Sequence, residues 1–210
     1  MTIMREAELK AMVLSALRAE KVINRASAIA SEYSIGGAGV RADLAVLSDT
    51  FVGVEIKSEV DGLRRLDRQL AAYRTVFDRV ILVVAAAHRA LIDRRAIASV
   101  EIWTVGSDGF LVEQGIRQEP VGGRLHLLTL EERKRWKSLV AMSPDEAFRA
   151  AFHARYGPTS DAFWKAVQRR RIRVEDLDIL SRFKPSRVQA AEFRAARDEA
   201  WVQWQDPVAA

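Results

Sequence analysis

Two carboxylates and one lysine in the first third of the chain have the types and spacing that phosphodiester hydrolysis needs. Asp43 lies in the segment VRADLAVL, and Glu55 and Lys57 follow in FVGVEIKS after a spacer of eleven residues. Carboxylate oxygens bind Mg²⁺, and water and a substrate phosphate fill its remaining octahedral positions. The cation lowers the pKa of a bound water, which a neighbouring lysine can orient or activate. The trio therefore predicts a metal-dependent site in which Asp43 and Glu55 hold Mg²⁺ or Mn²⁺ and Lys57 acts on the attacking water.

Two short strands are expected to position these groups. Both segments are rich in Val, Ile and Phe, and residues 48–50 between them form a predicted turn. Residues two apart in a strand point to the same face, so Glu55 and Lys57 should project together while Ile56 enters the core. Pairing of the strands as a hairpin would bring Asp43 alongside. A plainer alternative stays open, in which Glu55 and Lys57 form an exposed ion pair on a solvent-facing strand.

The segment after the second strand has the pattern of an amphipathic helix followed by a buried strand. Its apolar stripe consists of Leu63, Leu66, Leu70 and Phe77, and its polar row of Arg65, Gln69 and Tyr73. Residues 79–86 are then almost continuously apolar, which is typical of a strand buried on both faces, as in parallel pairing. The row that carries Gln69 and Tyr73 would either support the metal site or lie on an ordinary helix surface.

Taken together, this order of motifs over roughly residues 5 to 90 resembles the PD-(D/E)XK nuclease superfamily in its small, restriction-endonuclease-like form. The run from Glu32 through Phe77 also looks like a family of small uncharacterised bacterial and prophage proteins. The resemblance implies an α/β fold with an α-β-β-β-α-β core, a mixed sheet and metal-dependent cleavage of DNA more than of RNA. It further implies that the carbonyl of Ile56 is a metal ligand. Ala42 stands where the family name has proline.

By the same resemblance, Gln69 and Tyr73 would shape the site and contact the phosphate or the bound water. A further acidic ligand is expected, and two candidates remain open. Glu8 lies at the border of the apolar face of the predicted first helix, whereas Glu32 lies on or near the predicted first strand. The resemblance favours Glu8, since the superfamily often carries such a glutamate on its first helix, although either residue would also fit a solvated carboxylate.

The charge is uneven along the chain. Residues 131–210 hold 16 Lys and Arg against 12 Asp and Glu, whereas residues 1–130 hold 17 against 16. We therefore expect a nuclease-like core over residues 1–130 and a basic, helical subdomain over residues 131–210. The residues that we expect to contact nucleic-acid phosphates are Lys165, Arg169, Arg170, Arg171 and Arg173. A solvated helix end explains the same cluster equally well.

The last third should contain several helices, and a hairpin and a linker should precede it. The expected helices cover residues 131–142, 143 to a stop at Gly157-Pro158, 160–171 and 185 to about 204. A hairpin is predicted from residues 100–105 and 109–114, and a linker at residues 118–123.

Composition excludes several other classes of protein. No run approaches the roughly 18 apolar residues of a membrane span, and no secretory segment is evident, so we expect a cytoplasmic protein without a membrane partner. The chain has no cysteine and three dispersed histidines, which argues against disulfides, zinc sites and a Ser-His-Asp triad. A homodimer is a possible assembly. The alternative function is a non-catalytic nucleic-acid-binding module, or a partner-dependent prophage or defence module, that keeps the nuclease fold.

Overall fold

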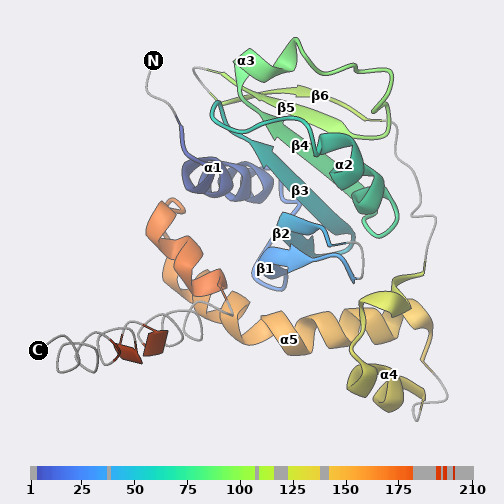
Figure 1. The fold of residues 1–210 in the computed structure, drawn as a ribbon. Coiled ribbons are helices and arrows are strands. Elements are labelled where there is room, and N and C mark those ends of the chain that lie inside the picture. Colours follow the sequence, from blue (N-terminus) through green and yellow to red (C-terminus); the bar gives the residue numbers. More distant parts are fainter. Residues whose placement is uncertain are drawn as a thin grey trace, which may run out of the picture.

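The computed structural model describes residues 4–36, 39–106, 109–115, 123–137, 142–181, 193–194, 196–197 and 201. The elements follow in the order α1 (Glu6–Ala19), β1 (Ala28–Ser34), β2 (Arg41–Leu47), β3 (Phe51–Lys57), α2 (Leu66–Arg74), β4 (Arg79–Val84), α3 (Ala86–Arg89), β5 (Glu101–Val105), β6 (Phe110–Glu113), η2 (Arg124–Leu127), α4 (Leu130–Lys137), α5 (Pro144–Val167) and η3 (Val174–Leu180) (Figure 1). The two η elements are short 3₁₀ helices.

A six-stranded mixed sheet with the strands in sequence order forms the centre of the molecule. The pairs β1–β2, β2–β3 and β5–β6 are antiparallel, whereas β3–β4 and β4–β5 are parallel. The predicted α-β-β-β-α-β order, the mixed sheet and the two hairpins are therefore confirmed. Because β4 is paired in parallel on both sides, its apolar run is buried almost throughout, as the sequence indicated.

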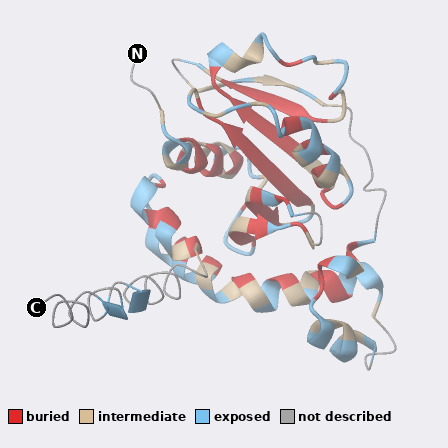
Figure 2. Cartoon of the chain, in the orientation of Figure 1, coloured by how far each residue is buried: buried red, intermediate tan, exposed pale blue. Residues whose placement is uncertain are grey.

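The sheet separates two hydrophobic cores, and helices cover both of its faces (Figures 1 and 2). Leu66, Leu70 and Tyr73 of α2 pack into the first core, while Leu9, Val13 and Leu17 of α1 pack into the second. These helices have apolar stripes because residues three and four apart share a helix face. They hold the ends of β2 and β3 between α1 and α2, and the candidate residues lie at those ends.

Helix α5 contributes to both cores and runs through the predicted stop at Gly157-Pro158. Proline inside a helix costs about 3 kcal/mol, since it removes a hydrogen bond and clashes with the preceding turn. Here Phe152 lies in the first core and Phe163 in the second, so burial on both sides of Pro158 favours one continuous helix. In addition, the Ser160 hydroxyl donates to the carbonyl of Tyr156 at 2.7 Å. The prediction of two separate helices was wrong because tertiary packing outweighs the local signal.

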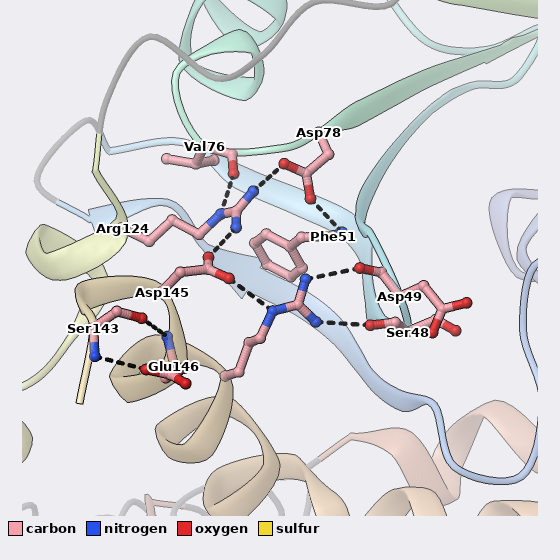
Figure 3. Close-up of polar contacts among 10 residues, drawn as sticks. Ser48, Asp49, Phe51, Val76, Asp78, Arg124, Ser143, Asp145 and Glu146 are labelled. Atoms are coloured by element: carbon pink, nitrogen blue, oxygen red, sulfur yellow. Dashed lines mark hydrogen bonds and ion pairs between the residues drawn. The ribbon is translucent and has the colours of Figure 1, made fainter. Parts of the chain in front are cut away.

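A buried arginine ties the C-terminal helices to the sheet (Figure 3). The side chain of Arg124 is 7% exposed, and its Nε donates to the carbonyl of Val76 at 2.8 Å. It also forms ion pairs with Asp78, just before β4, and with Asp145 in the first turn of α5. Arg149 on α5 bonds Asp145 in turn, with Nε 2.8 Å from Oδ2. This network fixes η2 and α5 to the end of the sheet opposite the candidate residues of β3.

The remaining predictions for the last third of the chain have mixed outcomes. The helix start at Ser143-Pro144 is confirmed by a capping box, in which Ser143 Oγ accepts from the N–H of Glu146. The helix predicted at residue 131 begins at Leu130 and is described as far as Lys137. Of the helix expected from residue 185, the structure describes residues 193–194, 196–197 and 201, all of which are helical. The rest of that helix and most of the linker lie outside the described residues, and the division of the chain at residue 130 stays a prediction. Among the described residues, no helix is both long and apolar enough to cross a membrane.

Candidate active site

Asp43 and the end of β3 are joined where the ladder between β2 and β3 stops. The register of this pair runs from Leu47 opposite Phe51 to Leu44 opposite Val54. Beyond this register, the backbone N–H of Ile56 donates to Oδ2 of Asp43 at 2.6 Å. A side chain of β2 therefore supplies the acceptor that a backbone carbonyl would supply within the paired strands. The hairpin predicted from the sequence thus brings Asp43 beside the Glu-Ile-Lys segment.

The carboxylate of Glu55 is deeply enclosed, because Glu55 is 1% exposed. Its Oε1 accepts from Lys57 Nζ at 2.6 Å and from Gln69 Nε2 at 2.5 Å, while its Oε2 accepts from the Tyr73 hydroxyl at 2.5 Å. Burial raises the pKa of Tyr73, so its phenol stays protonated and able to donate. The predicted polar row of α2 therefore faces the site rather than solvent at Gln69 and Tyr73, and the alternative of an exposed Glu55–Lys57 pair is wrong.

Glu55 and Ile56 both retain capacity to accept further ligands. A carboxylate offers about four acceptor positions, and the hydrogen bonds to Glu55 occupy three of them. In a strand the N–H and C=O of one residue point to the same side. The N–H of Ile56 points to Asp43, so its carbonyl points to that side as well. Asp43, Glu55 and Ile56, the residues of the predicted ligand set, all line one cavity.

A second group of carboxylates surrounds Asp43. Oxygens of Glu6 on α1, Glu32 on β1 and Asp43 lie within 4.8 Å of one another. Lys10, one turn after Glu6, is 6% exposed, and its Nζ lies 2.5 Å from Glu6 Oε1 and 2.7 Å from Glu32 Oε1. A lysine is almost never buried without such partners. Lys10 therefore acts as an internal counter-ion for this acidic group.

Backbone strain accompanies the position of Glu32. Its φ is +57°, in the left-handed region that non-glycine residues seldom adopt. Ala28, Ala30 and then Tyr33 all contribute to the first core, so the alternation of β1 breaks between Ala30 and Tyr33, where Glu32 lies. In the register of β1 and β2, Glu32 falls opposite Asp43, between the pairs Ser31–Leu44 and Tyr33–Ala42. Strain of this kind costs about 1–3 kcal/mol and is concentrated at functional sites.

The electrostatics around Asp43 favour a cation. Burial, and after it the charge of Glu55, raises the pKa of Asp43 to about 8, although Lys10 and the Ile56 N–H act in the opposite direction. When Asp43 is ionised, Glu6, Glu32, Asp43 and Glu55 together carry two more formal negative charges than Lys10 and Lys57 balance, so a bound cation would favour the ionised form. Oxygen-only donors, a crowded carboxylate and this excess charge fit one hard divalent cation such as Mg²⁺ or Mn²⁺.

These groups form the floor of a cavity of about 390 Å³. Three arginines also line it, namely Arg41 at the start of β2 and Arg65 and Arg68 at the start of α2. All three are exposed, as is Glu6, whereas Asp43 is half-buried and Glu55 is buried, so the arginines lie nearer the solvent than these last two carboxylates. A cavity of this design can take a cation together with a polyanion.

Two parts of the sequence prediction lie elsewhere in the structure. Glu8 is exposed and accepts the backbone N–H of Arg5 at 2.7 Å, so α1 presents Glu6 to the cavity instead. The predicted phosphate-binding cluster of residues 165–173 lies at the end of α5 and the loop after it. Arg170 there is held by Asp176 through two bonds of 2.6 and 2.7 Å.

Sequence reasoning missed Glu6 and Lys10, although a signal for Lys10 was present. Lys10 precedes Val13, Leu14 and Leu17 by three, four and seven residues, which is the spacing of a buried stripe. A lysine at that position is either a break in the stripe or a buried partner of carboxylates. Glu6 lies one turn before it, so the pair could have been found together.

Comparisons with known proteins connect the chain to a phage family. The sequence profile of the family described as bacteriophage P4 protein cII matches residues 1–143. Protein cII of Enterobacteria phage P4 is 30% identical over 100 residues, which are 48% of this chain and 38% of that protein. The chain thus matches well under half the length of this relative. Among solved structures, a protein of unknown function from Silicibacter pomeroyi matches 66% of this chain and 93% of its own, at 16% identity and a TM-score of 0.43.

Proposed function

The chain belongs to the bacteriophage P4 protein cII family, and we propose that it is a metal-dependent nuclease of the PD-(D/E)XK type that hydrolyses DNA. One observation carries this proposal. The Glu55 carboxylate is held by Lys57, Gln69 and Tyr73 in the cavity that also contains Asp43. An ion pair with only a structural role would not need a crowded second carboxylate beside it.

The roles of the residues follow from their positions. Asp43, Glu55 and the Ile56 carbonyl would hold Mg²⁺ or Mn²⁺, with Glu6 and Glu32 adjacent. When bound, the cation would supply an activated water and stabilise charge on the phosphoryl oxygens. Hydrolysis forms a bond from the water oxygen to phosphorus and breaks the bond to one sugar oxygen, which takes up a proton.

Lys57 would orient the attacking water, because its Nζ is fixed by Glu55 at 2.6 Å. Gln69 and Tyr73 would fix Glu55 and thereby the direction of its free acceptor position. Removal of any of these donors should disturb the geometry on which the reaction depends, even where the donor does not touch substrate.

A second candidate function is a non-catalytic nucleic-acid-binding module. It is favoured by the three hydrogen bonds that Glu55 already accepts, which would stabilise the carboxylate without a metal ion. Such a module would bind nucleic acid and leave it intact.

Cleavage assays with Asp43→Asn distinguish the two. Circular plasmid and labelled single-stranded DNA would be incubated with Mg²⁺, Mn²⁺ or EDTA. We expect metal-dependent cleavage that falls on the order of 10²-fold or more in Asp43→Asn, because metal and oxyanion stabilisation dominate such reactions. Asp67→Asn, an exposed aspartate on α2, is the matched control and should cut like wild type. Cleavage by Asp43→Asn at the wild-type rate would exclude the nuclease assignment.

A further inference from the structure

We propose that the arginines at the opening of the cavity, Arg41, Arg65 and Arg68, form the surface that binds the phosphates of the nucleic-acid strand. This inference rests on the proposed function, since it places the substrate backbone over the same cavity. It assigns the main phosphate contacts to the start of α2 and of β2, and not to the cluster at residues 165–173.

The arginines have the placement that phosphate binding needs. All three are exposed and line the one cavity that contains Asp43 and Glu55. Arg65 and Arg68 are one turn apart on α2 and thus share a helix face. Arg41 contacts Glu32 only at 3.9 Å, with a side chain that is 61% exposed. Exposed guanidinium groups recognise phosphate oxygens well, because their planar donors can bind two oxygens at once.

The negative floor makes these arginines necessary for a nucleic-acid substrate. A phosphodiester approaching Asp43, Glu55, Glu6 and Glu32 is repelled by groups of its own sign. Positive charge immediately above that floor offsets the repulsion and positions the phosphates that flank the reacting one. The arginines therefore select for a chain of phosphates over a single small phosphate ester.

The C-terminal cluster is poorly placed for this task. Arg18 near the end of α1 donates to the carbonyl of Val167 at 2.9 Å, so the end of α5 lies against the far end of α1. Glu6 lies at the first turn of the same helix. At 1.5 Å per residue, these ends of α1 are roughly 18 Å apart. The cluster thus lies several nucleotides away from the cavity, whereas Arg65 and Arg68 border it.

Two double variants of equal charge change test the assignment. Arg65→Gln/Arg68→Gln removes two cations from the cavity opening, and Arg169→Gln/Arg171→Gln removes two exposed cations from the C-terminal cluster. Binding of labelled single- and double-stranded DNA oligonucleotides would be measured by fluorescence anisotropy in EDTA, from about 50 to 200 mM salt. EDTA prevents cleavage, so the readout is binding alone.

We expect the first pair to lower affinity on the order of 10- to 100-fold near 0.1 M salt. It should also reduce the slope of log affinity against log salt by about 0.7–0.9 per lost contact. The second pair should bind almost like wild type. A larger loss with the second pair, or no binding by wild type at the lowest salt, would overturn the proposal. Failure of the nuclease proposal alone would give another result. DNA would still bind through the arginines in EDTA, but it would not be cut when Mg²⁺ or Mn²⁺ is added.

Discussion

Oδ2 of Asp43 accepts the backbone N–H of Ile56 at 2.6 Å, and this bond joins the two carboxylate-bearing strands at the point where their ladder ends. The bond has two consequences. It fixes Asp43 beside Glu55 without a metal ion, and it aims the Ile56 carbonyl at the same space. The site is therefore largely preorganised, which reduces the ordering cost of binding a cation.

The preorganisation of Glu55 by Tyr73 can be tested with a single hydroxyl. In Tyr73→Phe, Glu55 Oε2 loses its 2.5 Å donor inside a buried site. We expect a loss of about 1–3 kcal/mol in the free energy of unfolding, since a buried acceptor is left unpaired, and slower metal-dependent cleavage. Urea unfolding and initial cleavage rates would measure the two effects.

Tyr33→Phe is a matched control for that experiment. Tyr33 is 1% exposed, and among the described residues its hydroxyl has no hydrogen-bond partner. Removal of this hydroxyl should leave stability unchanged or raise it. Equal losses in Tyr33→Phe and Tyr73→Phe would show that the Tyr73–Glu55 bond contributes nothing specific.

The raised pKa of Asp43 predicts an unusual dependence of stability on pH. Its folded-state pKa of about 8 exceeds the ordinary value of 3.8, so between these pH values the folded chain binds a proton that the unfolded chain lacks. Stability in EDTA should therefore fall as pH rises from about 4 to about 8, by at most about 1.4 kcal/mol per pH unit from this group. Asp43→Asn should lack this contribution.

Urea unfolding of wild type and Asp43→Asn across that pH range isolates the effect as a difference between the two proteins. Asp67→Asn is again the control, because this exposed side chain should not alter the slope. Parallel pH profiles for wild type and Asp43→Asn would contradict the assigned pKa.

Lys10 should control how strongly the acidic group attracts cations. Its Nζ lies between Glu6 and Glu32 at 2.5 and 2.7 Å, so Lys10→Met leaves these carboxylates without their counter-ion. We expect the variant to lose about 1 kcal/mol of stability in EDTA, because the side chains of Glu6 and Glu32 are 47% and 32% exposed and such ion pairs contribute little. Mn²⁺ should then raise its melting temperature more than that of wild type. An equal or smaller rise in Lys10→Met would rule out the counter-ion role.

The close packing under the site predicts the effect of a single added methyl group. Gly53 on β3 lies under the ring of Phe77, and a Cβ there would be 2.6 Å from Cγ of that ring. Phe77 cannot readily move, because it also packs against Phe51 with ring centroids 4.6 Å apart. We expect Gly53→Ala to cost about 1–3 kcal/mol of stability. Gly62→Ala, with nothing within 4 Å of its added Cβ, should cost far less, and the same loss in both would refute the packing argument.

The sequence predicted those parts of the site that depend on the periodicity of single strands and helices. Asp43, Glu55 and Lys57 lie on strands that their own apolar neighbours define, and Gln69 and Tyr73 lie one turn apart on a helix with a clear apolar stripe. Strand alternation and helix periodicity are short-range rules, so they place these five residues on their strands and helix. That Gln69 and Tyr73 face the site was indicated only by the family resemblance.

The parts that the sequence did not predict depend on contacts between distant segments. The left-handed backbone at Glu32 and the burial of Lys10 arise only when α1 packs against β1 and β2. The passage of α5 through Pro158 likewise requires both cores to form around it. No local pattern reports the free energy of such burial. Glu8 was therefore favoured over Glu32, Glu6 was not recognised, and a helix end was expected at Pro158.

The variant Lys57→Ala gives the sharpest test of the proposed metal-dependent nuclease function. Lys57 Nζ bonds Glu55 Oε1 at 2.6 Å, and the variant keeps every carboxylate of the proposed metal site. Single-turnover cleavage of labelled DNA would be measured with Mg²⁺ and Mn²⁺, beside Lys134→Ala as an exposed-lysine control. We expect Lys134→Ala to cut like wild type and Lys57→Ala to be slower by on the order of 10²-fold or more. Wild-type cleavage by Lys57→Ala, or no metal-dependent cleavage by any of the three proteins, would contradict the proposed function.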